Sequence, residues 1–80
     1  MQVDISGSLR TGAGGASTLE IEASTIRELL TRLVERYPEM QAHLDEGIAV
    51  AINGDIYRDD WTKEIPPDAD IVLIPRIKGG

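Results

Sequence analysis

Residues 25–38, TIRELLTRLVERYP, are the most informative segment for the fold, because the spacing of apolar residues changes there from two to three and four. This spacing predicts one apolar face of an amphipathic helix. Thr25, followed three residues later by Glu28, predicts a capping box, in which each side chain bonds a backbone N–H of the first turn. Pro38 should end the helix near Tyr37, because proline has no backbone N–H to donate. The apolar positions of the helix are Ile26, Leu29, Leu30, Leu33, Val34 and Tyr37.

The segments before the helix alternate with a period of two. Residues 2–9, QVDISGSL, place Val3 and Leu9 in phase, and residues 18–23, TLEIEA, alternate apolar with acidic side chains. Such alternation is typical of half-buried strands. Residues 10–17, RTGAGGAS, have the composition of a loop. We therefore expect an antiparallel hairpin with a long connection ahead of the helix.

Strand character returns after the helix. Residues 40–47 are mixed and leave room for a short turn of helix, and IAVAIN at 48–53 alternates again. Asn53-Gly54 is the strongest hairpin signal in the chain and predicts a short partner strand at 56–58. IVLI at 71–74 is apolar on both faces and should be a central or covered strand. The predicted order is β, β, α, β, β, β, an α+β domain.

Composition limits the classes of protein that fit. Eighty residues suffice for one small domain, and 41% hydrophobic with 28% charged residues indicates an ordinary globule. Eight Lys and Arg against fourteen Asp and Glu give a net charge of −6, which disfavours nucleic acid and favours a basic protein partner. No cysteine, no export signal and no long apolar run are found, so we expect a cytoplasmic protein without a membrane segment.

Side chains suited to catalysis or metal binding are scarce. His43 is the sole histidine, which disfavours a histidine-based acid–base pair or metal cluster. We expect His43 to be solvated or locally hydrogen-bonded, or else to contact a partner. Two aspartate pairs, residues 59–60 and 68–70, fit solvated turns better than a cation site. We expect no catalytic residue of its own, no metal site and no bound cofactor.

Two further features have a structural interpretation. The loop TGAGGAS, residues 11–17, lacks the ending of a phosphate-binding loop and does not precede a helix, so it should serve as a hairpin connection. Trp61 and Tyr57 are expected to pack in the core, because a chain without Phe needs its few aromatic side chains there.

The chain ends in Gly79-Gly80, after Ile74 and the segment Pro75-Arg76-Ile77-Lys78. If the domain spans residues 1–74, a flexible tail of residues 75–80 could extend about 20 Å from it, at ~3.3 Å per residue. Two residues without side chains can enter a narrow channel in a partner enzyme. The terminal carboxylate becomes reactive only when an enzyme makes its oxygen a good leaving group, for instance by adenylation. A plain interaction domain with an accidental Gly-Gly ending is the alternative.

Three segments together resemble the MoaD/ThiS-type sulfur carriers, which have the ubiquitin-like β-grasp fold. They are LVERYPE at 33–39, AVAINGD at 49–55 and DADIVLIPRIKGG at 68–80, and the resemblance covers the whole chain. It implies a mixed sheet of four to five strands packed on one amphipathic helix. The length favours the molybdopterin synthase small subunit, MoaD, over the shorter thiamine carrier.

The resemblance also implies a function for the tail. Gly80 would be adenylated by a ubiquitin-activating-type adenylyltransferase that uses ATP, and then converted to a thiocarboxylate that donates sulfur. Gly79, which has no side chain, would allow the tail to pass through a narrow channel. Residues 75–78 would be threaded into a larger synthase subunit or another acceptor enzyme. Ile74 lies at the root of the tail. Partners would dock on an apolar surface that includes either Ile71 and Leu73 or Val72 and Ile74, whichever pair faces away from the helix.

Two departures from MoaD leave the acceptor open. This chain has Ala69-Asp70 where MoaD proteins commonly have Gly-Asp, and the basic Arg76-Ile77-Lys78 in place of a neutral linker. The ending RIKGG is similar to that of ubiquitin, so a protein modifier conjugated through Gly80 to lysines is an alternative. A sulfur carrier for thiamine, cysteine or tRNA thiolation is another.

Overall fold

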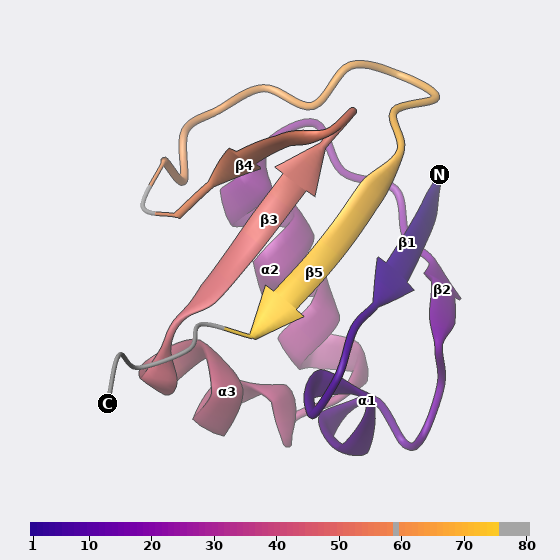
Figure 1. The fold of residues 1–80 in the computed structure, drawn as a ribbon, viewed down its shortest axis with the longest axis vertical. Coiled ribbons are helices and arrows are strands. Elements are labelled where there is room, and N and C mark those ends of the chain that lie inside the picture. The colour runs from indigo at the N-terminus through magenta and orange to yellow at the C-terminus, as the bar shows by residue number, and fades with distance from the viewer. Residues whose placement is uncertain (59, 76–80) are drawn as a thin grey trace.

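The computed structural model describes residues 1–58 and 60–75. It contains three helices and five strands in these residues (Figure 1). In chain order the elements are β1 (Gln2–Ile5), α1 (Leu9–Gly12), β2 (Thr18–Glu20), α2 (Ile26–Arg36), α3 (Met40–Glu46), β3 (Ile48–Ile52), β4 (Asp55–Tyr57) and β5 (Ile71–Pro75). The predicted α+β class is confirmed.

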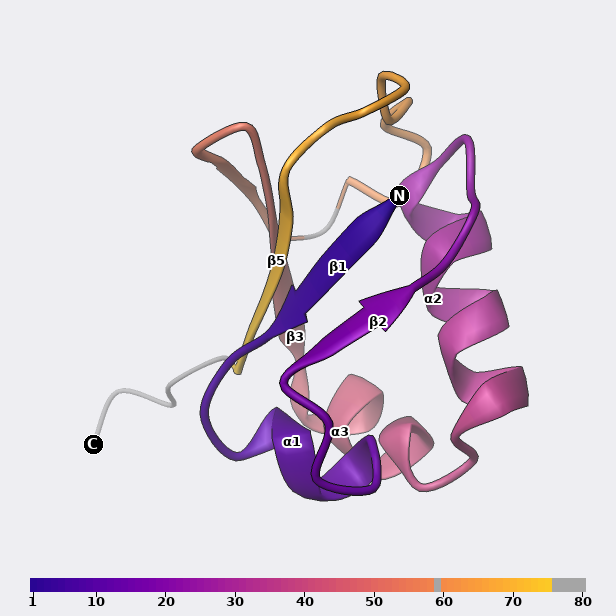
Figure 2. The same ribbon diagram turned by 90° about the vertical axis from the view of Figure 1, so that its right-hand side faces the viewer.

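The five strands form one mixed sheet in the order β2-β1-β5-β3-β4. β1 and β5 are parallel, and the other neighbouring pairs are antiparallel. α2 covers one face of the sheet, while α1 and α3 lie at the end where β5 finishes (Figure 2). β5 is central, as its two apolar faces predicted, because it has β1 on one side and β3 on the other.

α2 forms where the helical period predicted it and buries Ile26, Leu29, Leu30 and Leu33 against the sheet. The hydroxyl of Thr25 accepts a hydrogen bond from the N–H of Glu28 at 3.2 Å, as predicted. The return bond differs from the prediction. The Glu28 carboxylate accepts from the N–H of Ser24 at 3.0 Å and not from that of Thr25. The Thr25 hydroxyl thus satisfies a backbone donor in the first turn of α2, and the Glu28 carboxylate satisfies one just ahead of the helix.

The region before α2 differs from the prediction in two ways. Leu9 was expected in the first strand, but β1 ends at Ile5 and Leu9 begins α1 inside the expected loop. Gly7 explains the change, since its φ of +57° turns the chain out of the extended conformation. β2 ends at Glu20, three residues before the predicted end of the second strand.

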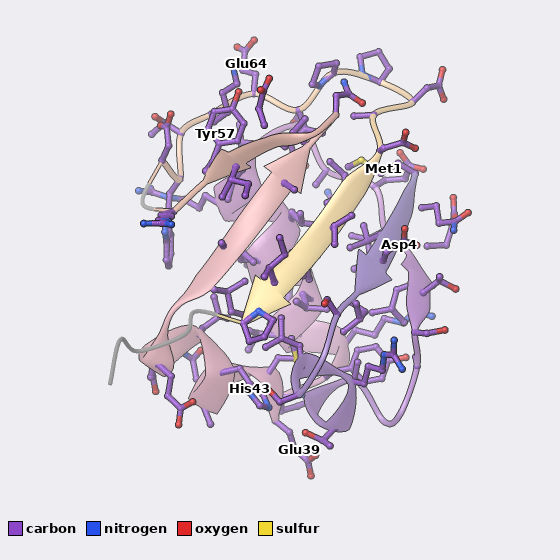
Figure 3. The ribbon with its side chains drawn as sticks, in the orientation of Figure 1. Met1, Asp4, Glu39, His43, Tyr57 and Glu64 are labelled. Atoms are coloured by element: carbon purple, nitrogen blue, oxygen red, sulfur yellow. The ribbon has the colours of Figure 1, made fainter. Side chains whose placement is uncertain are left out.

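α1 fits against α3 because Gly12 has no side chain. A Cβ at Gly12 would lie 2.8 Å from the Cδ2 of His43 and would also collide with the Sδ of Met40. His43 is half-buried on the side of α3 toward α1 (Figure 3), so it is a packing residue between two helices. Within the mixed stretch 40–47, α3 has seven residues, so it is longer than the short turn of helix that the sequence predicted.

The two aromatic residues expected in the core have different environments. Tyr57 is half-buried and packs against the core, as expected, with the Nζ of Lys63 5.3 Å from its ring centre. The prediction for Trp61 was wrong, because 42% of its surface is exposed. Trp61 lies in the long connection between β4 and β5, where it lines a surface groove with α2 and α3.

The N-terminal amine joins the edge of the sheet. Met1 N lies 2.6 Å from the Glu22 carboxylate and 3.2 Å from that of Glu20. The hydrogen bond to Glu22, and then the contacts with Glu20, raise the pKa of this amine above its ordinary value of 8.0. The ion pairs hold the chain start beside β2.

Candidate partner-docking face and chain terminus

The face of the sheet opposite α2 has no element over it in the described residues (Figure 2). β5 alternates across the sheet: Ile71 and Leu73 are 1% and 0% exposed, on the α2 side. Val72 and Ile74 point to the other face and are half-buried. Of the two pairs that the sequence left open, Val72 and Ile74 therefore face away from the helix.

The strand register gathers more apolar side chains around this pair. Ala51 of β3 lies opposite Val72, and Ala49 lies opposite Ile74. Ile56 of β4 lies opposite Ala51 and is 57% exposed. We call Ala49, Ala51, Ile56, Val72 and Ile74 the outer-face patch.

The shape of the outer-face patch follows from side-chain size. The two alanines are small and nearly buried, so they form a floor, and the branched side chains stand around it. Asp4 lies on the β1 side, opposite Val72 (Figure 3), and places a carboxylate at the rim. An apolar centre with a polar rim is the usual anatomy of a protein–protein interface.

Sequence reasoning missed Ala49, Ala51 and Ile56 as members of this face. The signal was present, because Ala49 and Ala51 alternate with Val50 and Ile52, and Asn53-Gly54 sets the register that aligns Ile56. Alanine is not conspicuous in a hydrophobic pattern, and the face that α2 covers was not known.

The root of the chain terminus is held on both sides. Pro75 pairs with Ile48 of β3, and the carbonyl of Leu73 accepts a hydrogen bond from the N–H of Ser6 at 3.0 Å. A Cβ at Gly7 would lie 3.4 Å from the Cγ of Pro75, so the ring packs closely on this loop. β5 thus runs one residue beyond the predicted 71–74 and ends beside the outer-face patch.

The other predicted tail residues, Arg76, Ile77, Lys78, Gly79 and Gly80, lie outside the described residues. The flexible tail and the boundary between residues 74 and 75 therefore stay predictions. Of the predicted site, the described residues contain Ile74 and Pro75, and both lie at the end of β5.

The acidic turns do not form a metal site in the described residues. Within 1–58 and 60–75, no three His, Asp or Glu side chains come together as metal ligation would need. The backbone of Asp70 is paired with Asn53: Asp70 N–H donates to the Asn53 Oδ1 at 2.9 Å, and Asn53 N–H donates to the Asp70 carbonyl at 2.9 Å. Asp59 lies outside the described residues. Asp70 thus closes a loop against the β3–β4 turn.

No helix in the described part of the chain is both long and apolar enough to cross a membrane.

A mixed sheet with a central last strand, one long helix across it and a terminus leaving that strand define the ubiquitin-like β-grasp class. Residues 3–80 match the model of the ThiS family. The chain belongs to this family of small sulfur-carrier and ubiquitin-like proteins, and the resemblance to the MoaD/ThiS type is confirmed.

Solved structures support the same fold. The chain is similar to the Amycolatopsis orientalis BexX/CysO complex, with a TM-score of 0.76 and 22% identity over 99% of this chain and 98% of that chain. For SAMP1 from Haloferax volcanii the TM-score is 0.77 and the identity is 20%, over 99% of this chain and 97% of that chain. For a putative molybdopterin converting factor, subunit 1, from Pyrococcus furiosus the TM-score is 0.78 and the identity is 21%, over 95% of each chain. No curated protein matches the chain by sequence.

Proposed function

We propose that this protein is a sulfur carrier whose C-terminal Gly80 is adenylated and then thiocarboxylated. The observation that carries the proposal is the family match, which extends to residue 80 and so includes the Gly-Gly ending. The protein supplies no catalytic group. It acts as a cosubstrate, with ATP used by the activating enzyme and no cofactor bound to the carrier itself.

The chemistry needs only the terminal carboxylate. One carboxylate oxygen attacks the α-phosphorus of ATP and pyrophosphate leaves, so Gly80 becomes an acyl-adenylate. Hydrosulfide then attacks the carbonyl carbon of Gly80 and AMP leaves with that oxygen, so sulfur takes the place of one carboxylate oxygen. Gly79 and Gly80 have no Cβ to obstruct either attack, and residues Pro75 to Lys78 span the distance from β5 to the partner's active site.

Two kinds of partner follow from this chemistry. The first is a ubiquitin-activating-type adenylyltransferase, and the second is the enzyme that accepts the sulfur. We propose that both dock on the outer-face patch, since it lies beside the root of the tail and has an apolar centre. Because the carrier has a net charge of −6, partners with basic residues around their docking surfaces would bind it best. We assign these reactions to the cytoplasm.

Molybdopterin synthesis is the pathway that we propose, with a large synthase subunit as the acceptor. The similarity to a putative molybdopterin converting factor supports this choice. Thiamine, cysteine or tRNA thiolation are the other acceptor routes, since one fold serves several acceptors.

A protein modifier joined through Gly80 to target lysines is the second candidate. Two observations favour it. One is the basic Arg76-Ile77-Lys78 linker, and the other is the similarity to SAMP1, the small archaeal modifier protein 1 of Haloferax volcanii. Both candidates begin with adenylation of Gly80 and differ in the nucleophile that follows.

Intact mass spectrometry separates the candidates. The protein is incubated with extract of its own cells, ATP and a sulfur source, and a chain lacking Gly80 is the matched control. A sulfur carrier gains the mass of one sulfur minus one oxygen at Gly80, and the control gains none. Conjugates with Gly-Gly remnants on lysines would support the modifier instead. If neither product forms, both candidates fail and the Gly-Gly ending has no role.

A further inference from the structure

An open groove lies between α2, α3 and the β4–β5 connection, on the α2 side of the sheet and away from the outer-face patch (Figure 2). Its apolar floor is made by Leu30 of α2, Leu44 of α3 and Trp61. These three residues line both of its hollows. One hollow, of about 310 Å³, extends toward Val34, and the other, of about 180 Å³, extends toward the start of β3. The two hollows are therefore neighbours along one groove.

The loop that carries Trp61 is fixed to the first turn of α2. The N–H of Arg27 donates to the Trp61 carbonyl at 2.9 Å, and the N–H of Ile26 donates to the Lys63 carbonyl at 3.0 Å. The core closes without the Trp61 side chain, and 42% of its surface stays exposed. A large apolar side chain is thus held in place at the surface, where it forms one side of the groove. A surface that is ordered before binding lowers the cost of binding.

The rim of the groove is acidic. Glu35 lines the larger hollow, Asp45 and Glu46 line the smaller hollow, and all three are exposed. Arg58 is the one basic residue among the described residues that line the two hollows. Glu35 belongs to α2, whereas Asp45 and Glu46 belong to α3, so carboxylates stand on both sides of the groove. Such a rim attracts cations and repels anions.

The acidic rim limits the possible occupants. A second copy of the chain has the same net charge of −6, and two copies related by a twofold axis across the groove would place carboxylates against carboxylates. Nucleic acid and the anionic surface of a membrane are repelled for the same reason. A protein segment that carries Lys or Arg on either side of apolar side chains complements both the rim and the floor.

The arrangement of the hollows favours a helix as this segment. Two apolar side chains three or four residues apart on a helix lie on one face, about 5–6 Å from each other, so they can enter neighbouring hollows. Basic side chains that flank this face would then lie beside Glu35 on one side and beside Asp45 and Glu46 on the other.

We propose that this groove docks a basic amphipathic helix of a partner protein. Two apolar side chains of that helix occupy the hollows against Leu30, Leu44 and Trp61, and its Lys or Arg side chains pair with the carboxylates on both sides. The sheet lies between the groove and the outer-face patch, so a partner in the groove leaves the patch free (Figure 2). The docking does not depend on sulfur chemistry.

Trp61 provides the readout, because it is the sole tryptophan of the chain and lines the groove. The probe is a synthetic peptide with leucine at every third and fourth position and lysine elsewhere. We expect saturable binding with a blue shift of the Trp61 emission, and the binding should weaken as salt rises to about 1 M. One matched peptide has serine in place of each leucine, and another has glutamate in place of each lysine. Neither should shift the emission.

A charge-reversed pair tests the rim. Glu35→Lys with Glu46→Lys should weaken peptide binding about tenfold, because attraction becomes repulsion. Both lysines would lie near the C-terminal end of a helix, where the helix dipole favours cations, so the fold is retained. Asp55→Lys with Asp70→Lys changes the net charge equally at the β3–β4 turn. Neither aspartate lines a hollow, so this control pair should keep the affinity within about twofold.

Leu44→Ala tests the floor without a change in charge. It should weaken binding about 5- to 10-fold, with the fold checked by circular dichroism. An unchanged affinity for this variant, an equal loss in the two charge-reversed pairs, or equally tight binding of the serine peptide would overturn the proposal, because net charge alone would then explain the binding. A blue shift that grows with protein concentration without peptide would also overturn it and assign the groove to a second copy. The titration involves neither ATP nor an activating enzyme, so its failure is distinguishable from failure of the proposed function.

Discussion

Ile56→Ser tests the outer-face patch most directly. Ile56 is 57% exposed, so its replacement removes little from the core and the fold should persist. Burying a whole isoleucine side chain contributes about 1.5–3 kcal/mol. The 57% that remains for a partner to cover then corresponds to about 1–2 kcal/mol. Because 1.4 kcal/mol is tenfold, we expect affinity for the proposed activating enzyme to fall about 5- to 30-fold.

The assay is ATP–pyrophosphate exchange by the cognate activating enzyme at increasing concentrations of the carrier. The KM for the carrier should rise by the stated factor. The maximal rate should stay the same, since Gly80 is untouched. Thr62→Ala, at an exposed position of the β4–β5 connection, is the matched control and should leave KM unchanged. An unaltered KM for Ile56→Ser, with the fold confirmed by circular dichroism, would refute docking on this patch.

Three further predictions concern stability, each measured by thermal or urea unfolding. Thr25→Ala removes the cap of α2 and should cost about 1 kcal/mol, or about 4–8 °C in Tm; an unchanged Tm would contradict the cap. Gly12→Ala inserts a methyl group against the Met40 and His43 side chains of α3 and should cost about 1–3 kcal/mol, and an unchanged Tm would contradict tight packing at this position. The Met1 amine has its pKa raised by Glu22, so its contribution is complete below the ordinary value of 8.0 and is lost as pH rises through the raised pKa. Glu22→Gln should reduce this alkaline loss of stability, and an unchanged pH profile would exclude the pair as its cause.

Local pattern was enough to predict most of the elements. The helical period at 25–38, the alternation in the strands and the Asn53-Gly54 turn depend on residues close together in sequence. The Thr25 cap was predicted for the same reason. The return bond from Glu28 was misplaced by one residue, because Ser24 and Thr25 both offer a backbone N–H within reach of the carboxylate.

Other features depended on contacts between distant segments. Leu9 continues the odd-position pattern of the first strand, yet the turn at Gly7, which packs against Pro75 at the far end of the chain, directs it into α1. Trp61 was expected in the core because a chain without Phe has few aromatic side chains, but the core closes without it and leaves it at a groove between two helices. Neither outcome can be derived from a window of neighbouring residues.

The candidate site divides in the same way. The Gly-Gly ending and the two alternating pairs of β5 could be recognised without the structure, because each is a property of a short segment. The folded structure was needed to show that Val72 and Ile74 face outward and that Ala49, Ala51 and Ile56 join them. One face of a sheet becomes the core because a helix covers it, and the choice of face depends on the whole fold.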